Sequence, residues 1–465
     1  YDAEQGMLPY AVPFDSLGNR IDLTGGEVNL LNPIGENKYT TNLRKTLRGL
    51  GSVYAELQLL KGLKYRISFG PDLYSYYNGI FEDSMSMNRG GGVPGSTDYA
   101  QLNQTSNTSW TLDNLIYYDR TFAKHHAINV TLLHESMYNR SENSSMTGIN
   151  VLEKSKWYAL NSVSALSGFS TGLTENSLES YMGRVNYSYD DKYLLTAFMR
   201  WDGASVLAAG HKWDQFPSVS VAWRLDKENF MQKLSWIDQL KLRFGMATVG
   251  NAAVTPYTTL GALQPEYYTW GSTVEEGYVA SDASLANPMT YPDQDLKWEH
   301  TTQYNLGLDF SVFKNRLSGS VDVYSTRTTD LLMDRNIPSV NGYVTMLTNI
   351  GSTAGKGIDV TLNSLNLQAK DFSWNTSLSF SANRDKIVSL ATGKVNDVSN
   401  LWFIGQRISV DYDYKKIGIW QNTTADLAAM AKFNANGNNF QPGDIKIADL
   451  DNNGVIKASD RMILG

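Results

Sequence analysis

The feature that most constrains this chain is a strict alternation of apolar and polar residues. Between positions 303 and 312, Tyr304, Leu306, Leu308, Phe310 and Val312 occupy every second position, and polar residues or glycine stand between them. The same alternation resumes at positions 317–323, after the short polar segment 314–316. Because successive side chains of a strand point to opposite faces, this pattern predicts a β-hairpin with one apolar face.

The hairpin pattern recurs along the chain, which predicts about thirteen strands of roughly 9–11 residues, the length that a tilted membrane crossing requires. Besides the two strands above, the pattern predicts eleven further strands, at positions 53–60, 63–73, 115–119, 127–133, 181–189, 193–201, 216–225, 240–249, 358–362, 374–381 and 414–420.

The connections between these strands alternate in length. Those near Lys61, Asp190, Lys314 and Ala369 are short, whereas the segments 76–109, 139–178, 251–297 and 384–411 are long. The segment 226–238 departs from this rule: Phe230, Leu234 and Ile237 stand at helical spacing, and we interpret the segment as an enlarged periplasmic turn. Short turns on one rim and long loops on the other are typical of a transmembrane antiparallel up-and-down β-barrel, with periplasmic turns and extracellular loops. A water-soluble β-sandwich is the alternative.

The composition narrows the function classes further. The sequence contains no run of about 20 apolar residues, so a membrane crossing would have to use strands. With a net charge of −7, the chain lacks the basic character of nucleic-acid binders. It also has no cysteine, which excludes disulfides and thiolate metal sites. Residues 1–10 carry no signal-peptide pattern, so we expect a mature or internal piece of a polypeptide.

Several ordered segments of the sequence resemble the barrel repeats of SusC/RagA-type TonB-dependent outer-membrane transporters. They are SYMGRVNYSYDDKYLLTAFMRWDGAS (180–205), QFPSVSVAWRL (215–225), LKLRFGMATVGN (240–251), LKWEHTTQYNLGLDFSVFKNRLSGSVDVY (296–324), TNIGSTAGKGIDVTLN (348–363) and GDIKIADLDNNGVIKASDRMILG (443–465). The resemblance extends through nearly the whole chain.

The resemblance implies a 22-stranded barrel with an N-terminal plug, in the outer membrane of a Gram-negative bacterium. About thirteen strands cannot close that barrel, so we expect residues 1–440 to be part of it and residues 441–465 to form an extracellular loop. The implied activity is active import of an oligosaccharide or a peptide, without bond chemistry. The implied partners are a SusD-like surface lipoprotein, the TonB–ExbB–ExbD complex and outer-membrane lipid, and the implied assembly is a dimer of transporter–lipoprotein pairs.

A calcium-loop spacing occurs near the end of the chain. Asp449, Asp451, Asn453, Gly454 and Asp460 stand at positions 1, 3, 5, 6 and 12 of the pattern, and Val455 would add its backbone carbonyl. By the parity of the connections we expect this loop outside the cell, where Ca²⁺ is plentiful, so a bound Ca²⁺ would be structural and would fix the loop. The implied import requires no cofactor. The alternative is an Asx-rich surface turn that its own side chains stabilise.

Aromatic residues in the predicted loops are candidates for stacking on sugar rings, since loops on a rigid scaffold commonly carry binding residues. The candidates are Trp213, Tyr267, Tyr268, Trp270 and Trp402. Each of them has an alternative role in loop packing or in contact with the lipoprotein partner.

Two other function classes compete with the importer. A soluble extracellular β-protein that binds glycans would account for the loop aromatics but not for the alternating connection lengths. An outer-membrane barrel enzyme would need a nucleophile beside a base, and the sequence has five histidines but no G-x-S-x-G motif. The sequence therefore favours the importer.

Overall fold

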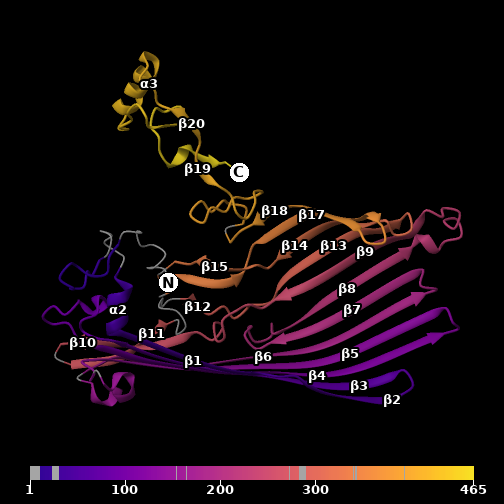
Figure 1. Ribbon diagram of the computed structural model, residues 1–465, viewed down its shortest axis with the longest axis horizontal. Helices are drawn as coiled ribbons and strands as arrows, with labels where there is room; N and C mark the ends of the chain where they lie inside the picture. The colour runs from indigo at the N-terminus through magenta and orange to yellow at the C-terminus, as the bar shows by residue number, and fades with distance from the viewer. Residues whose placement is uncertain are drawn as a thin grey trace.

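One large antiparallel sheet dominates the structure, a computed structural model that describes residues 11–23, 31–152, 154–163, 165–271, 273–281, 290–338, 340, 343–391 and 393–464. Thirteen strands form it, in the order β1-β3-β4-β5-β6-β7-β8-β9-β13-β14-β17-β18, with β2 also paired to β3. Figure 1 shows the sheet curling from β1 to β18. Its strands are β1 Thr40–Leu50, β2 Val53–Leu60, β3 Leu63–Glu82, β4 Tyr99–Phe122, β5 His126–Ile149, β6 Ala165–Tyr189, β7 Tyr193–Ala204, β8 Trp213–Arg224, β9 Ile237–Asn251, β13 Glu299–Val312, β14 Leu317–Thr329, β17 Ser352–Gln368 and β18 Ser373–Ser389.

Smaller elements extend from one end of this sheet and from its C-terminal side (Figure 1). They are the strand pair β10 Ala262–Trp270 and β11 Thr273–Ser281, the sheet of β12 Thr290–Tyr291, β15 Leu332–Asn336 and β16 Thr345–Asn349, and the pairs β19 Tyr412–Tyr414 with β22 Arg461–Ile463 and β20 Lys416–Ile419 with β21 Ile445–Ile447. The helices are α2 Pro33–Tyr39, α3 Thr424–Ala435 and the 3-10 helices η2 Met87–Arg89, η3 Lys156–Ser162, η4 Leu225–Lys227 and η6 Ala458–Asp460. None of the described helices has the length and apolarity that a membrane-spanning helix needs.

The strands β1 and β2 lie on the same edge of β3 and form one interrupted crossing. Leu50 is opposite Asp72, and Val53 is opposite Phe69. Pro71 lies between these two partners of β3, and its missing N–H breaks the ladder. The strand order therefore contains twelve crossings.

The expectation of an all-β, antiparallel up-and-down sheet is confirmed, but two details of the strand assignment are wrong. Strand β1 was not predicted, because the sequence TTNLRKTLRGL lacks a clean alternation. The predicted strand 414–420 is extended at β20, yet it pairs with β21 outside the large sheet. The local sequence determines that this segment is extended, but it does not determine which strand the segment pairs with.

The two faces of the sheet differ in polarity, which follows from the alternation and the register. On one face, Val221, Phe244, Leu306 and Val323 lie side by side on β8, β9, β13 and β14, and Phe244 and Leu306 are 44% and 51% exposed. We call this the outer face. The other face, here called the inner face, carries mainly Ser, Thr, Asn and charged residues, which are less exposed along β7 and β13. A sheet with this polarity suits an apolar surrounding outside and water inside.

Aromatic side chains form two bands on the outer face. Near the short turns, the rings of Tyr189, Tyr193 and Trp223 follow one another at centroid distances of 6.3 and 6.4 Å. Toward the other rim, the ring centroids of Trp110 and Tyr138 are 6.0 Å apart. Along β5 the two bands are about twelve residues apart, which corresponds to about 40 Å of strand. If the strand is tilted by about 40° from the membrane normal, this separation spans roughly 30 Å along the normal, which is the thickness of a hydrocarbon core. The bands are typical of membrane interfaces.

The predicted parity of the connections is present in the structure. On one rim, Gly62 with φ +86° and Asp190 with φ +52° form tight turns. The connection between β8 and β9 lies on the same rim and is longer, with η4 and further turns rather than an α-helix. The longer connections between β3 and β4, β5 and β6, β9 and β13, and β14 and β17 lie on the opposite rim (Figure 1).

The predicted strand lengths of roughly 9–11 residues are too short for several strands. Strands β3 to β6 have 20, 24, 24 and 25 residues and continue past the second aromatic band toward the long loops. In this region the sequence is polar on both faces, as in the segment 139–145, so no apolar alternation marks the strand. The backbone groups of β5 in this region are satisfied by its ladders with β4 and β6.

The sheet has two outer edges, at β1/β2 and at β18. Among the described residues, no ladder joins these edges to each other. Most side chains of β2 and β18 are exposed on both faces, as expected for strands with one paired edge. The described chain is thus a curved wall and not a closed barrel.

The connection between β5 and β6 packs onto the outer face beyond the second aromatic band. Trp157 is buried there with Phe81, Ala100, Val151 and Leu160. Its indole Nε1 donates a hydrogen bond of 2.7 Å to the Tyr77 hydroxyl. A Cβ atom on Gly79 would lie 2.0 Å from the Trp157 ring. The absence of a side chain at Gly79 therefore allows this loop to seat.

We predict that Gly79→Ala displaces Trp157 and opens the segment that contains η3. Overpacking of this kind costs about 1–3 kcal/mol. Trypsin cleavage after Lys154 or Lys156, followed by mass spectrometry on the detergent-purified protein, should accelerate several-fold. The matched control is Gly183→Ala, whose new Cβ would meet its nearest atom at an ordinary 3.7 Å. Equal cleavage rates for both variants would contradict the proposed role of Gly79.

Candidate functional site

The inner face carries a row of charged and polar residues across strands β4 to β7. Asp113 is opposite Glu135, Glu135 is opposite Ser180, and Ser180 is opposite Asp202. Arg200 joins this row, because its guanidinium donates to Glu135 at 2.6 Å, to Ser180 at 2.8 Å and to Asp202 at 2.6 Å. Arg200 is thus paired with two carboxylates, whereas Asp113 makes no ion pair with a described residue and its buried Oδ1 has no hydrogen-bond partner among them.

A second charged group lies on the same face at β9, β13 and β14. Arg243 donates to both oxygens of Asp309, at 2.9 and 2.8 Å, and to Asp322 at 3.0 Å. Gly307 lies beneath the guanidinium, since a Cβ there would be 2.6 Å from Arg243 Cζ. A residue larger than glycine would push Arg243 away from its two carboxylates.

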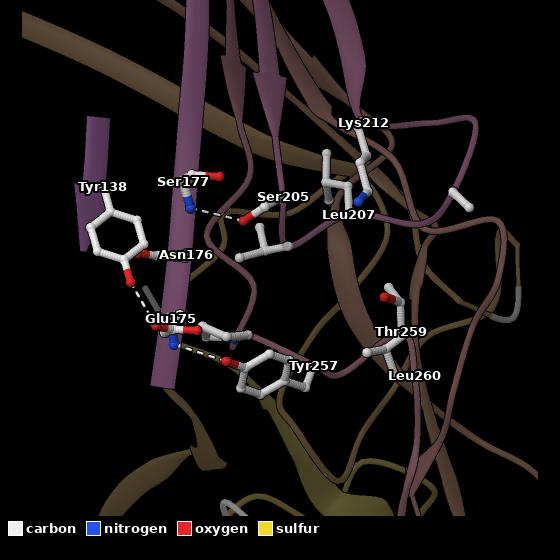
Figure 2. A pocket seen from close by; sticks show the side chains of 13 residues that line it. Tyr138, Glu175, Asn176, Ser177, Ser205, Leu207, Lys212, Tyr257, Thr259 and Leu260 are labelled. Atoms are coloured by element: carbon white, nitrogen blue, oxygen red, sulfur yellow. Dashed lines mark hydrogen bonds between the residues drawn. The ribbon is translucent and has the colours of Figure 1, made fainter. Parts of the chain in front are cut away.

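A cavity of about 380 Å³ lies where the upper part of β6 extends beyond β7 (Figure 2). Strand β7 pairs with β6 only as far as Leu178, so the backbone edge beyond it needs other partners. The N–H of Ser177 donates to Ser205 Oγ at 2.9 Å, and the N–H of Glu175 donates to the Tyr257 hydroxyl at 2.9 Å. The Tyr138 hydroxyl donates to Glu175 Oε1 at 2.6 Å. Two long loops therefore cap this strand edge and wall the cavity.

The structure separates the predicted loop aromatics instead of gathering them. Trp213 begins β8 and stacks on Tyr181 at 5.9 Å on the outer face, as a member of the second aromatic band. Trp402 lies after β18 and pairs its backbone with Asp397. No ring contact between the predicted aromatics occurs among the described side chains.

The other three predicted aromatics lie in the hairpin of β10 and β11. Tyr267 and Trp270 are 64% and 79% exposed, and the backbone of Tyr268 is opposite Glu275. Exposed rings on a protruding hairpin suit contact with a large partner or a cargo equally well. Their role in substrate binding stays a prediction.

The calcium-like loop is compact and lies between β21 and β22. One ligand oxygen each of Asp449, Asp451 and Asp460 lies within 4.8 Å of the others. Gly454 has φ +77°, as the sharp turn of such a loop requires. The Asn453 side chain accepts from the Val455 N–H at 2.8 Å, which is an Asx-turn bond. The geometry thus agrees with both the ion site and the self-stabilised turn.

Asp460 is the best-anchored member of this loop. It is fully buried, and its two oxygens accept the N–H groups of Leu450 and Lys457, both at 2.9 Å. The hydrogen bond from Lys457, assisted by that from Leu450, holds the pKa of this carboxyl below its ordinary value. Because the folded-state pKa is depressed, these bonds stabilise the loop above about pH 4 and are lost as the pH falls further.

The same segment belongs to a small module that stands apart from the large sheet (Figure 1). Its centre is Trp420, which contacts Phe433 and Phe440 at 5.9 Å each. The strand ladders join residues 445–447 to 416–419 and residues 461–463 to 412–414. The predicted boundary at residue 440 and the extracellular position of residues 441–465 stay predictions.

Comparison with known proteins agrees with this architecture. Residues 5–457 match the family described as TonB dependent receptor-like, beta-barrel. The chain belongs to this family of TonB-dependent receptors. TonB-dependent receptor P3 of Formosa agariphila is 30% identical over 97% of this chain and 44% of its own length. TonB-dependent receptor SusC of Bacteroides thetaiotaomicron is 32% identical over 62% of this chain and 28% of its own length. The resemblance found in the sequence is confirmed.

Solved structures show the same fold. The RagAB peptide importer in its closed-closed state aligns with a TM-score of 0.78 at 20% identity, over 97% of this chain and 48% of that chain. Another structure of the RagAB peptide transporter gives a TM-score of 0.75 at 22% identity, over 88% and 45% of the two chains. This chain thus spans less than half the length of these TonB-dependent relatives, so the activity of the whole protein is a matter for proposal.

Sequence reasoning missed the residues that line the upper inner face and the β6 edge. Asn107, Glu175 and Tyr257 stand in segments that were expected to be loops, and Tyr74 directly follows the predicted strand 63–73. The run Tyr74 to Tyr77 was the available signal, because tyrosines at this density favour a strand. Their proximity depends on the long-range register and has no local signature.

We predict that Ca²⁺ binds the loop and that Asp460→Asn abolishes the binding. Sites in extracellular modules have dissociation constants of about 10⁻⁴–10⁻³ M, and calcium at ten times that value stabilises the site by about 1.4 kcal/mol. Calorimetric titration of the purified protein with CaCl₂ measures the binding. Asp413→Asn is the control, because Asp413 lies in β19 outside the cluster. Absence of calcium-dependent heat in the parent protein would leave the Asx turn as the correct interpretation.

Proposed function

We propose that this chain is the wall of an importer of the SusC/RagA type in the outer membrane of a Gram-negative bacterium. In this proposal the transporter captures an oligosaccharide or a peptide together with a SusD-like surface lipoprotein. Energy reaches it from the TonB–ExbB–ExbD complex through a plug and N-terminal region outside this chain. Two transporter–lipoprotein pairs form a dimer.

The observation that carries the proposal is the two-faced sheet with its aromatic bands. An exposed face of Val, Leu, Phe and Tyr is unfavourable in water, and within a bilayer it becomes the favourable surface. The crossings between the two edge strands are paired with a neighbouring strand on each side, and a hydrocarbon environment requires such pairing of backbone groups. Membership of the TonB-dependent receptor family supports the same role.

The inner face supports passage of a polar cargo. The groups centred on Arg200 and Arg243 keep it hydrophilic, and each of these arginines is paired with two carboxylates. The cargo proposal remains an oligosaccharide or a peptide, because SusC and a peptide importer are both among the similar proteins.

An enzymatic alternative finds no support in the described histidines. Each of four histidines has a carboxylate within ion-pair distance, namely His125, His134, His211 and His300. The fifth, His126, makes a hydrogen bond with the Tyr187 hydroxyl. A hydrolase of the serine class would need a serine hydroxyl beside one of these rings, and no such pair occurs in the described part of the chain. The soluble glycan-binding alternative conflicts with the exposed apolar outer face.

The proposal is tested with the full-length protein in its native host. We expect it to fractionate with the outer membrane, to require detergent for extraction, and to purify with a surface lipoprotein and a bound small molecule that mass spectrometry identifies. Deleting its gene should reduce uptake of that molecule, labelled with ¹⁴C, to the background of passive entry. A protonophore should abolish uptake in the parent strain.

Recovery of the protein in the soluble fraction would contradict the membrane assignment. Unchanged uptake in the deletion strain, with the protein confirmed in the outer membrane, would contradict the importer. A strain that lacks an unrelated outer-membrane barrel serves as the control for general permeability.

A further inference from the structure

A second cavity, of about 580 Å³, lies on the inner face just beyond the upper aromatic band. Its floor is a row of residues that are direct cross-strand partners, so all five side chains point to the same face. The row runs through Arg48, Tyr74, Asn107, Ser141 and Thr174 on β1, β3, β4, β5 and β6. Ser141 follows Tyr138 of the aromatic band by three positions along β5, which places the row outside the apolar layer and near the long-loop rim.

The groups in this cavity are polar, and its charges are balanced. Arg48 donates to both oxygens of Asp72, at 2.9 and 2.6 Å. The other arginine in the lining, Arg140, precedes Ser141, so its side chain lies on the outer face, where it is paired with Glu142 and Glu175. A cavity in which every guanidinium already has a carboxylate offers little to a ligand with a net charge.

Hydrogen-bonding capacity is left over for a neutral ligand. Ser141 Oγ donates to Asn107 Oδ1 at 2.7 Å, which orients the amide. The Asn107 amide nitrogen and the hydroxyls of Tyr74 and Thr174 make no hydrogen bond to any described residue. These groups include both donors and acceptors. They match hydroxyl groups, which also donate and accept.

An aromatic surface lies beside these polar groups. The rings of Tyr74 and Tyr76 are nearly parallel, at 7°, with centroids 6.5 Å apart. Tyr76 lies two positions further along β3 on the same inner face, with Thr105 as its direct cross-strand partner. Two aligned rings along one strand, each beside side-chain amides or hydroxyls, suit a chain ligand with alternating C–H faces and polar edges.

We propose that this row and its two tyrosines bind a neutral oligosaccharide, with pyranose C–H faces on the Tyr74 and Tyr76 rings and sugar hydroxyls on Asn107 and Thr174. The assignment rests on the proposed import function and narrows its cargo. A peptide fits less well, because the lining of the Tyr74 cavity contains Pro256 as its one aliphatic residue and no unpaired charge for a terminus or an ionic side chain.

The test uses the full-length transporter with its lipoprotein partner, purified in detergent. Two probe sets are applied, an array of neutral oligosaccharides of four to ten sugars and a mixed library of peptides of seven to fifteen residues. The variants are Tyr74→Ala and Asn107→Ala. Tyr304→Ala is the matched control, because Tyr304 is a half-exposed tyrosine on the outer face of β13. Tryptophan fluorescence and mobility in unheated gels confirm that each variant folds.

We expect neutral oligosaccharides to bind, Tyr74→Ala and Asn107→Ala each to weaken binding at least tenfold, and Tyr304→Ala to leave it unchanged. Capture of peptides instead of oligosaccharides would overturn the inference and leave the import proposal standing. Equal oligosaccharide affinity in parent and Tyr74→Ala would also overturn it. Absence of binding from both probe sets, together with unchanged uptake in the deletion strain, would overturn the import proposal and this inference with it.

Discussion

The structure depends on the cross-strand hydrogen-bond ladder and on the two-residue period that the ladder imposes. Once Leu306 is opposite Phe244 on one side and Val323 on the other, every alternate residue of the three strands is assigned to one face. A register slip of one residue would move the apolar side chains to the inner face and the groups around Arg243 to the outer face. The polarity of the wall is therefore a property of the pairing as a whole.

The same ladder explains why the functional groups lie where they do. Beyond the upper aromatic band the strands β3 to β6 continue without a continuous apolar stripe, and each face of that extension makes contacts of its own. On its outer face the loop with Trp157 is seated against Gly79. On its inner face the row through Tyr74 and Asn107 remains open as a cavity. A rigid sheet thus holds the binding groups, and the loops complete their surroundings.

The sequence predicts the parts of this architecture that repeat locally. The alternation at 303–312 and 317–323 gives β13 and β14, and the alternating connection lengths give the two rims. It does not predict β1, whose charged residues interrupt the alternation, or the partner of β20. The row through Tyr74 escapes sequence reasoning for another reason: its members are separated by about 30 residues each, and only the register across several strands brings them together.

The polarity of the sheet requires that the outer face meets lipid while the inner face meets water. The chain has no cysteine, so single cysteines can be introduced at Val219, Ser220, Val221 and Ala222 of β8. Spin labels at these sites, in the full-length protein in native outer membranes, report oxygen from the lipid and a nickel chelate from the water. We expect oxygen to dominate at positions 219 and 221 and the nickel chelate to dominate at positions 220 and 222. Equal accessibility at all four sites, or the reverse order, would contradict this expectation.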